Sequence, residues 1–431
     1  MTGSDENNIV VGLQWGNEGK ERIIDFLAKH SDVIVRFQGC SNSGHTLSAN
    51  SGGGLKINYL PTGIQYSGKK CLICAGVTLD LENAAQEIAV LKERARLKAQ
   101  LIISPQCHLI LDYHKKLDVL DGRILGHGQN RTLHELGFGH CCSDKYRRFG
   151  IRVADLLHPD TLLEKLEQNL TIKNEYFTKI YGEKPMDVGD IFDKCLKLGE
   201  ILIPYVGDPS VVIEKAAADS MRILFEGCDG TLNDIDFGVY PYVMPMSALS
   251  SCAFAGTGIR HNMPVRIIGV AKSYCTRTDN GPFITEEFGV IAPFLRSRGN
   301  EFTEITGEQR RIGWLDIPAL KYALKKNGTN ILAVTKLDVL TGIDELKICT
   351  AYIVDGKERK DFDLTPAEMQ RAVPVYEVIE GWKEELSVCS DFNNLPMQAK
   401  AYIKFVEEAT GTSVIWVGVG SEWGNALFRR S

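Results

Sequence analysis

The sequence lacks the features of a membrane, secreted or nucleic-acid-binding protein. None of its 431 residues belong to an apolar run of about 18, the length that a membrane-spanning helix needs. The first eight residues are polar and acidic, without the basic and apolar regions of a signal peptide. No run rich in lysine and arginine stands out and the net charge is −6, so nucleic acid is not expected as a partner. Together these absences predict a cytoplasmic protein without a membrane anchor.

Repeats, low-complexity segments and linkers rich in proline, glycine and serine are also missing. A chain of this length with 44% hydrophobic residues can bury a sizeable core. We therefore expect a single domain over residues 1–431, with a helical insertion over residues 186–224. The twelve cysteines form no recognisable framework. Cys71 and Cys74 lie in an apolar run, which favours buried, reduced thiols over a metal site.

Short apolar runs alternate with helical patterns along the chain. Strands are predicted at residues 8–13, 32–36, 70–74, 101–104, 223–226, 265–271, 331–335 and 413–417. Helical spacing of apolar residues covers segments such as 20–29, 81–97 and 395–409. This alternation is typical of an α/β protein with a large central, mostly parallel sheet flanked by helices. Helical and small antiparallel subdomain insertions are expected around it.

A glycine-rich loop separates the first predicted strand from the first predicted helix. It reads Gly16-Asn17-Glu18-Gly19-Lys20. Glycines let backbone N–H groups approach an anion, the helix N-terminus adds positive potential, and Lys20 adds a cation. The loop is not a Walker A motif, because six residues instead of four separate Gly12 from Gly19 and Glu21 follows the lysine. The pattern favours a phosphate-binding loop; an ordinary strand-to-helix turn is the alternative.

A second motif, Thr335-Lys336-Leu337-Asp338, ends the apolar strand at 331–335. A carboxylate at this place can accept hydrogen bonds from the N1–H and 2-amino groups of guanine together, while the lysine stem stacks on the base. Adenine offers no such pair of donors. The motif therefore predicts selectivity for guanine nucleotides, and a surface turn is the alternative.

The first loop, followed by Val35-Arg36-Phe37-Gln38-Gly39 and Asn42-Ser43-Gly44-His45-Thr46, closely resembles the opening of the adenylosuccinate synthetase family. Colinear similarity continues through Asp234-Ile235-Asp236 and Gly313-Trp314-Leu315-Asp316 to Gly381-Trp382. The family uses GTP and Mg²⁺ to couple IMP to L-aspartate, through a 6-phosphoryl-IMP intermediate, in AMP biosynthesis. The resemblance implies a homodimeric, GTP-dependent carbon–nitrogen ligase.

The resemblance also implies roles for individual residues at the GTP end. Lys20 corresponds to a catalytic phosphate ligand and His45 to the general acid at O6. Position 17 and the carbonyl of Gly44 correspond to Mg²⁺ ligands. The last guanine-contacting loop falls at residues 418–420, without the usual Ser-Thr-Gly. The implied GTP contacts are Gly16, Glu18, Gly19, Lys20, Gly44, His45, Thr46, Arg310, Lys336, Leu337, Asp338, Gly418 and Gly420.

The second set of implied roles concerns IMP and aspartate. Arg148 corresponds to an arginine that reaches the IMP phosphate of the neighbouring subunit, and Arg310 to one that links the two nucleotide sites. The implied substrate contacts are Asn42, His134, Arg148, Asp229, Met244, Thr306, Glu308 and Arg310.

Departures from the family pattern fall mainly on this second set, with a further one in the phosphate loop. Asn17 stands in place of the aspartate that acts as the general base, and an amide neither takes up a proton at neutral pH nor brings charge to Mg²⁺. Asp229 replaces a glutamine that contacts IMP. Glu308 replaces an arginine that holds the aspartate carboxylates, which turns an ion pair into a repulsion. The remaining replacements are His134 for threonine, Leu136 for arginine and Met244 for threonine.

Three functions remain open at this point. The first is a ligase that makes adenylosuccinate from IMP, aspartate and GTP. The second is a catalytically impaired paralogue that binds guanine nucleotide. The third is a ligase that takes a different purine nucleotide or a different amine.

Overall fold

The computed structural model describes residues 7–40, 45–47, 55–125, 136–303, 307–420 and 425–429. Its centre is a nine-stranded sheet with the strand order β19–β18–β14–β10–β1–β9–β2–β5–β7. All neighbouring strands of this sheet are parallel except β18 and β19. The strands are β1 (Asn7–Gly12), β2 (Val33–Arg36), β5 (Lys70–Ile73), β7 (Gln100–Ile103), β9 (Ile223–Gly230), β10 (Val265–Lys272), β14 (Ile331–Thr335), β18 (Ser413–Gly418) and β19 (Ala426–Phe428).

The predicted fold class is confirmed, and each of the eight predicted strands is present. Strands in the middle of a parallel sheet are covered on both faces, so their sequences are almost continuously apolar and easy to recognise. Strand β19 was not predicted, because a three-residue antiparallel edge strand leaves little periodicity to detect.

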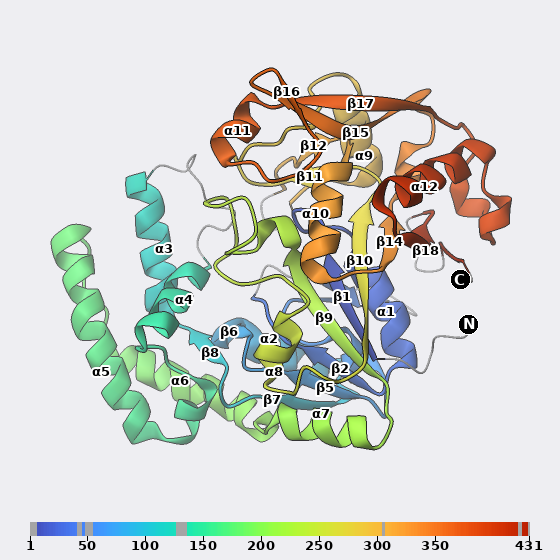
Figure 1. Ribbon diagram of the computed structural model, residues 1–431. Coiled ribbons are helices and arrows are strands. Elements are labelled where there is room, and N and C mark those ends of the chain that lie inside the picture. The colour runs from blue at the N-terminus through green and yellow to red at the C-terminus, as the bar shows by residue number, and fades with distance from the viewer. Residues whose placement is uncertain are drawn as a thin grey trace.

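Helices cover the sheet and extend beyond one of its ends (Figure 1). The group α3 to α6 lies at the left of Figure 1, beyond the part of the sheet that contains β5 and β7. The helices are α1 (Lys20–His30), α2 (Leu81–Glu93), α3 (Asp112–Leu125), α4 (Phe138–Arg147), α5 (Pro159–Glu175), α6 (Val188–Leu202), α7 (Pro209–Ala218), α8 (Cys252–Thr257), α9 (Ile291–Gly299), α10 (Ile317–Asn327), α11 (Pro366–Arg371) and α12 (Met397–Thr410).

Two helix boundaries differ from the sequence prediction. Helix α2 ends at Glu93 instead of continuing to residue 97, because Arg94 leaves helical geometry and Ala95 takes a left-handed conformation with φ of 50°. The segment 186–224 contains α6 and α7, but its last residues already belong to β9. That this segment is an insertion within a single domain of residues 1–431 stays a prediction.

Smaller sheets complete the structure, as the sequence analysis expected. The largest joins β13 (Leu315–Asp316), β15 (Glu345–Val354), β16 (Lys357–Arg359) and β17 (Val373–Glu380), and lies at the top of Figure 1. Within it β16 and β17 both run antiparallel to β15. The two-stranded sheets are β3 (His45–Leu47) with β4 (Leu55–Ile57), β6 (Thr78–Asp80) with β8 (His108–Ile110), and β11 (Cys275–Arg277) with β12 (Arg311–Gly313).

The central sheet separates two large apolar cores. Successive residues of a strand point to opposite faces, so Ile9 and Val11 belong to one core and Val10 to the other. Cys71 and Cys74 are buried and unpaired, which confirms their interpretation as core thiols. In the part of the chain that is described, no helix is long and apolar enough to cross a membrane.

Candidate nucleotide-binding site

Three loops that follow parallel strands meet at the carboxyl edge of the central sheet. They follow β1, β14 and β18, and loops at this edge are the usual ligand sites of open α/β sheets. Thr335 at the end of β14 donates a hydrogen bond from Oγ1 to the carbonyl of Glu18, at 2.5 Å. Arg22 of α1 donates to the carbonyl of Gly420 beyond β18. The structure thus brings together the predicted phosphate loop, the predicted guanine loop and the last predicted loop.

The phosphate loop takes a conformation that its sequence favours. Gly16, Asn17 and Gly19 all have positive φ angles, of 78°, 56° and 79°, which glycine and asparagine tolerate best. The buried carboxylate of Glu18 accepts hydrogen bonds from the backbone nitrogens of Gln14 and Gly16, both at 3.0 Å. Glu18 therefore holds the loop in shape from within.

Lys20 begins α1 and lies against the same carboxylate. Its Nζ is 2.5 Å from Oε2 of Glu18. Burial by itself lowers the pKa of Lys20, but the charge and hydrogen bond of Glu18 together with the charges of Asp229 and Glu21 outweigh burial, and the pKa is raised. The lysine is consequently a cation at neutral pH, as a phosphate ligand must be.

The guanine loop begins with Lys336 in a left-handed conformation, with φ of 56°. The carbonyl of Lys336 accepts a hydrogen bond from Oγ of Ser273 at 2.8 Å. Its Nζ donates to the carbonyl of Gly299 at 2.8 Å and to Oε1 of Glu301 at 2.7 Å. Asp338 is half-buried, and burial raises the pKa of its carboxyl although Arg22 and Arg298 oppose this.

Glu301 is the centre of a buried polar cluster beside this loop. Its side chain is 0% exposed and contacts four groups that donate to it. We call Glu301 and these four donors the Glu301 cluster. The donors are Lys272 at 3.1 Å, Tyr274 at 2.6 Å, Lys336 at 2.7 Å and Arg310 at 2.9 Å.

The charges of the Glu301 cluster shift its pKa values in opposite directions. Burial alone raises the pKa of Glu301, but Lys272 and Lys336 outweigh it and hold the pKa well below its usual value. Burial lowers the pKa of Lys272 to about 8, against the pull of Glu301. The glutamate is therefore ionised throughout the physiological range.

Arg310 connects the Glu301 cluster to the phosphate loop. While its Nη1 contacts Glu301, its Nη2 donates to Oδ1 of Asn17 at 3.1 Å. Arg310 was predicted to link the two nucleotide sites, and this position is consistent with that hypothesis. The amide oxygen of Asn17, which the resemblance matched to a Mg²⁺ ligand, faces a guanidinium instead.

The end of β9 packs beneath the phosphate loop. Asp229 has a left-handed backbone, with φ of 60°, and its Oδ1 accepts from the backbone N–H of Gly230 and from Nδ2 of Asn233, both at 2.8 Å. Asn233 also donates to the carbonyl of Trp15 at 3.0 Å. A Cβ placed on Gly16 would lie 2.6 Å from Oδ1 of Asp229, so only glycine allows this close approach.

Other predicted substrate residues lie in different surroundings. Arg148 ends α4 with an exposed side chain and a φ of 68°. Glu308 is exposed in the turn that precedes Arg310. Met244 is 1% exposed in an apolar cluster with Cys40 and other core residues, so its role as a substrate contact stays a prediction.

Several predicted site residues lie outside what the structure describes. These are Asn42, Gly44, His134 and Thr306. For His45 and Thr46 only the backbone is described, as part of β3.

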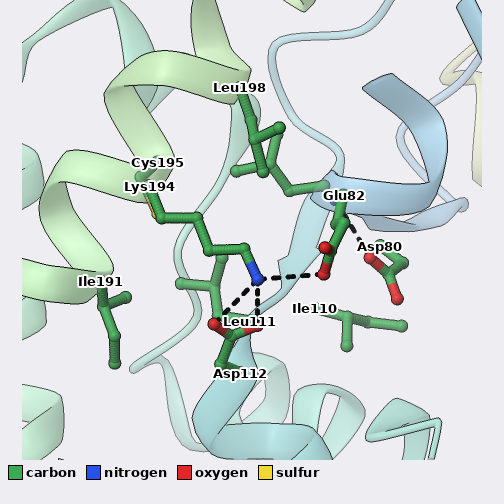
Figure 2. Close-up of a pocket in the computed structure, with 10 residues that line it drawn as sticks. Asp80, Glu82, Ile110, Leu111, Asp112, Ile191, Lys194, Cys195 and Leu198 are labelled. Atoms are coloured by element: carbon green, nitrogen blue, oxygen red, sulfur yellow. Dashed lines mark hydrogen bonds and ion pairs between the residues drawn. The ribbon is translucent and has the colours of Figure 1, made fainter. Parts of the chain in front are cut away.

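A small pocket elsewhere is not a second candidate site. It lies where α2, α3 and α6 meet, and Lys194 points into it between two carboxylates (Figure 2). Nζ of Lys194 is 2.9 Å from Oε2 of Glu82 and 2.9 Å from Oδ1 of Asp112. The third carboxylate of the pocket, Asp80, pairs with Lys115 at 2.7 Å, and no predicted site residue lines the pocket.

Sequence reasoning missed several residues that shape the site. Glu301, Lys272 and Tyr274 were not singled out, and neither were Gln14 and Asn233 at the phosphate loop. Lys272 carried a usable signal, because a charged residue at the end of an apolar parallel strand lies at the ligand edge of the sheet.

The family model of adenylosuccinate synthetase matches residues 9–426. The chain belongs to the adenylosuccinate synthetase family. Members of this family are ligases that form a carbon–nitrogen bond.

Individual members of the family resemble the chain over nearly its whole length. It is 42% identical to the adenylosuccinate synthetase of Caldanaerobacter subterraneus, over 98% of this chain and 99% of that protein. It is 41% identical to that of Nitratidesulfovibrio vulgaris, over 98% and 100%. The structure of fully ligated adenylosuccinate synthetase from Plasmodium falciparum matches with a TM-score of 0.91 and 31% identity, over 99% and 100% of the two chains.

Proposed function

We propose that this chain is a GTP-dependent ligase that joins IMP and L-aspartate to give adenylosuccinate, GDP and phosphate. The observation that carries the proposal is the Thr335–Glu18 hydrogen bond, which joins the guanine loop to the phosphate loop at one edge of the sheet. One nucleotide can span both loops, with its base at Asp338 and its phosphates at Lys20. Full-length similarity to the family favours this function over a non-catalytic paralogue or a different amine substrate.

GTP is the nucleotide that this arrangement fits. The carboxylate of Asp338 would accept from N1–H and the 2-amino group of guanine, and the Lys336 stem would cover the base. At the other end, backbone N–H groups of the glycine loop and the cation of Lys20 would hold the phosphates. The proposed GTP contacts on or beside these loops are Gly16, Glu18, Gly19, Lys20, Arg310, Lys336, Leu337, Asp338, Gly418 and Gly420.

Of the two predicted magnesium ligands, Gly44 lies outside the described residues and Asn17 offers only a neutral amide oxygen. The described residues contain no group of three His, Cys, Asp or Glu side chains that could bind a metal ion. The amide oxygen of Asn17 is neutral and accepts a hydrogen bond from Arg310. In our proposal Mg²⁺ therefore enters with GTP, as the counter-ion of its phosphates, and no step depends on a protein-bound metal.

The chain is proposed to act as a homodimer in the cytoplasm. Arg148 is exposed and would reach the IMP phosphate of the neighbouring subunit. Tyr146 and Phe149 flank it, with 81% and 37% of their surface exposed. Exposed aromatic side chains around an arginine are typical of protein interfaces.

The test is an assay of the purified protein with GTP, IMP and aspartate, followed by the absorbance of adenylosuccinate. Product should form with GTP and not with ATP. Omission of IMP and omission of aspartate serve as controls. If calorimetry shows that GTP and IMP bind but no product forms, the ligase proposal is wrong and the chain is a non-catalytic paralogue.

A further inference from the structure

The proposed reaction needs a base that the phosphate loop does not supply. O6 of IMP becomes a nucleophile when N1 loses its proton. Asn17 cannot take this proton, because an amide is not a base at neutral pH. Its oxygen is also engaged by Nη2 of Arg310. If the ligase function proposed above holds, another group must accept the proton.

Two carboxylates near the loop are already engaged. The oxygens of Glu18 accept from Gln14, Gly16 and Lys20. Glu301 is enclosed by its four donors and is 0% exposed. Every oxygen of these two carboxylates therefore accepts at least one hydrogen bond within the protein.

Asp229 differs from both. Its Oδ1 accepts from Gly230 and Asn233, while Oδ2 has no hydrogen bond to any residue that the structure describes. The carboxyl lies against Gly16, directly before Asn17 in the loop. Asn233 ties Asp229 to the carbonyl of Trp15, which fixes the carboxylate relative to the loop.

We propose that Asp229 is the general base of this chain. Oδ2 of Asp229 takes the proton as the N1–H bond of IMP breaks. The electron pair passes through the ring to O6, which attacks the γ-phosphorus of GTP. The bond between this phosphorus and the bridging oxygen breaks, and GDP leaves. Relative to the family pattern, the carboxylate of position 17 and the amide of position 229 have changed places.

The surroundings of Asp229 suit this role. Burial raises the pKa of its carboxyl to about 6. The hydrogen bonds from Asn233 and Gly230 and the charge of Lys20 lower it, while the charge of Glu18 raises it. A base is most effective when its pKa lies just below the working pH, where it is ionised but still attracts a proton.

A structural role for Asp229 is the competing explanation. Its left-handed backbone and its two accepted hydrogen bonds could themselves favour aspartate at this position. Asp229→Asn separates the two explanations, because asparagine tolerates the same φ and keeps an accepting Oδ1 but cannot take a proton. Asp229→Gln restores the family residue and provides a second variant.

The experiment measures kcat for adenylosuccinate formation in five proteins, namely the unmodified protein, Asp229→Asn, Asp229→Gln, Asn17→Asp and the double variant Asn17→Asp/Asp229→Gln. The affinity for GTP from calorimetry is the check on folding. Asp229→Asn and Asp229→Gln should each lower kcat by about 10²- to 10⁴-fold, with the affinity for GTP unchanged. The double variant Asn17→Asp/Asp229→Gln should recover most of the loss. In the unmodified protein, activity should fall about tenfold per pH unit below the Asp229 pKa of about 6, and this limb should move in the double variant.

The outcomes separate the two proposals. If the unmodified protein makes product and Asp229→Gln makes as much or more, the base assignment is wrong while the ligase function stands. If the unmodified protein makes none but Asn17→Asp alone does, both the base assignment and the ligase function of the natural chain are wrong.

Discussion

By the resemblance to the family, the proposed GTP end and the proposed IMP–aspartate end of this site depart from the family pattern to very different degrees. At the GTP end, Lys20, Lys336 and Asp338 keep the family residues and lie on loops that hydrogen bonds join directly. At the other end, Asn17, Asp229 and Glu308 all differ from the family pattern. In our proposal the carboxylate and the amide of positions 17 and 229 have changed places, whereas the repulsion that Glu308 introduces has no such counterpart.

Apart from the Asp229 variants, the largest effect is expected at Lys20, next to the phosphates of GTP. Lys20→Ala should lower kcat by about 10²- to 10³-fold, because it removes the cation from the transferring phosphoryl. Steady-state kinetics with IMP at saturation would measure the loss. The double variant Lys20→Ala/Glu18→Gln controls for the unpaired Glu18 charge, and a kcat that recovers in it would contradict the role of Lys20 as a phosphate ligand.

The next largest effect is expected from a substitution in the guanine loop. Asp338→Ala should reduce the preference for GTP over ATP by about 10- to 100-fold, because a hydrogen bond to a charged group contributes ~1.5–3 kcal/mol. The ratio of kcat/KM for GTP and ATP would measure this change. Asp338→Glu keeps the charge and serves as the matched control. A ratio that Asp338→Ala leaves unaltered would place base recognition elsewhere.

At the IMP–aspartate end, restoring a positive charge should improve the use of aspartate. Glu308→Arg should raise kcat/KM for aspartate by about tenfold, because it replaces a repulsion by an ion pair with the dicarboxylate. Glu308→Gln, which only removes the repulsion, should give a smaller gain. If Glu308→Arg instead weakens aspartate use, residue 308 does not face the amino acid.

The smallest expected effect concerns assembly. Arg148→Ala should raise KM for IMP about fivefold without changing KM for GTP, since a solvent-accessible charged contact contributes on the order of 1 kcal/mol. Sedimentation of the same variant should still show a dimer. A monomeric natural protein at micromolar concentration with ligands present would disprove the cross-subunit role of Arg148.

Much of the fold could be predicted because it follows from local patterns. The apolar run from Ile331 to Thr335 predicted a buried strand, and the polar residues after it predicted a loop at its end. The antiparallel sheet of β15 to β17 was less visible, because β17 is largely exposed and lacks a continuous apolar run.

The site could be predicted only in part, for a physical reason. The sequence marked Asn17 and Asp229 as separate anomalies, but their relationship depends on the packing of β9 beneath a loop more than 200 residues earlier in the chain. The Glu301 cluster depends likewise on contacts between β10, the segment after α9 and the loop after β14. Such contacts are set by strand order, which local periodicity does not encode.

The hydrogen bond between Thr335 and Glu18 also has a kinetic consequence. Both partners of this hydrogen bond belong to the protein. The distance between the guanine loop and the phosphate loop is therefore fixed before GTP binds. A nucleotide then loses its own freedom on binding but does not have to order these two segments, which lowers the entropic cost of association. We expect GTP capture to follow simple one-step kinetics, with an observed rate that rises linearly with GTP concentration.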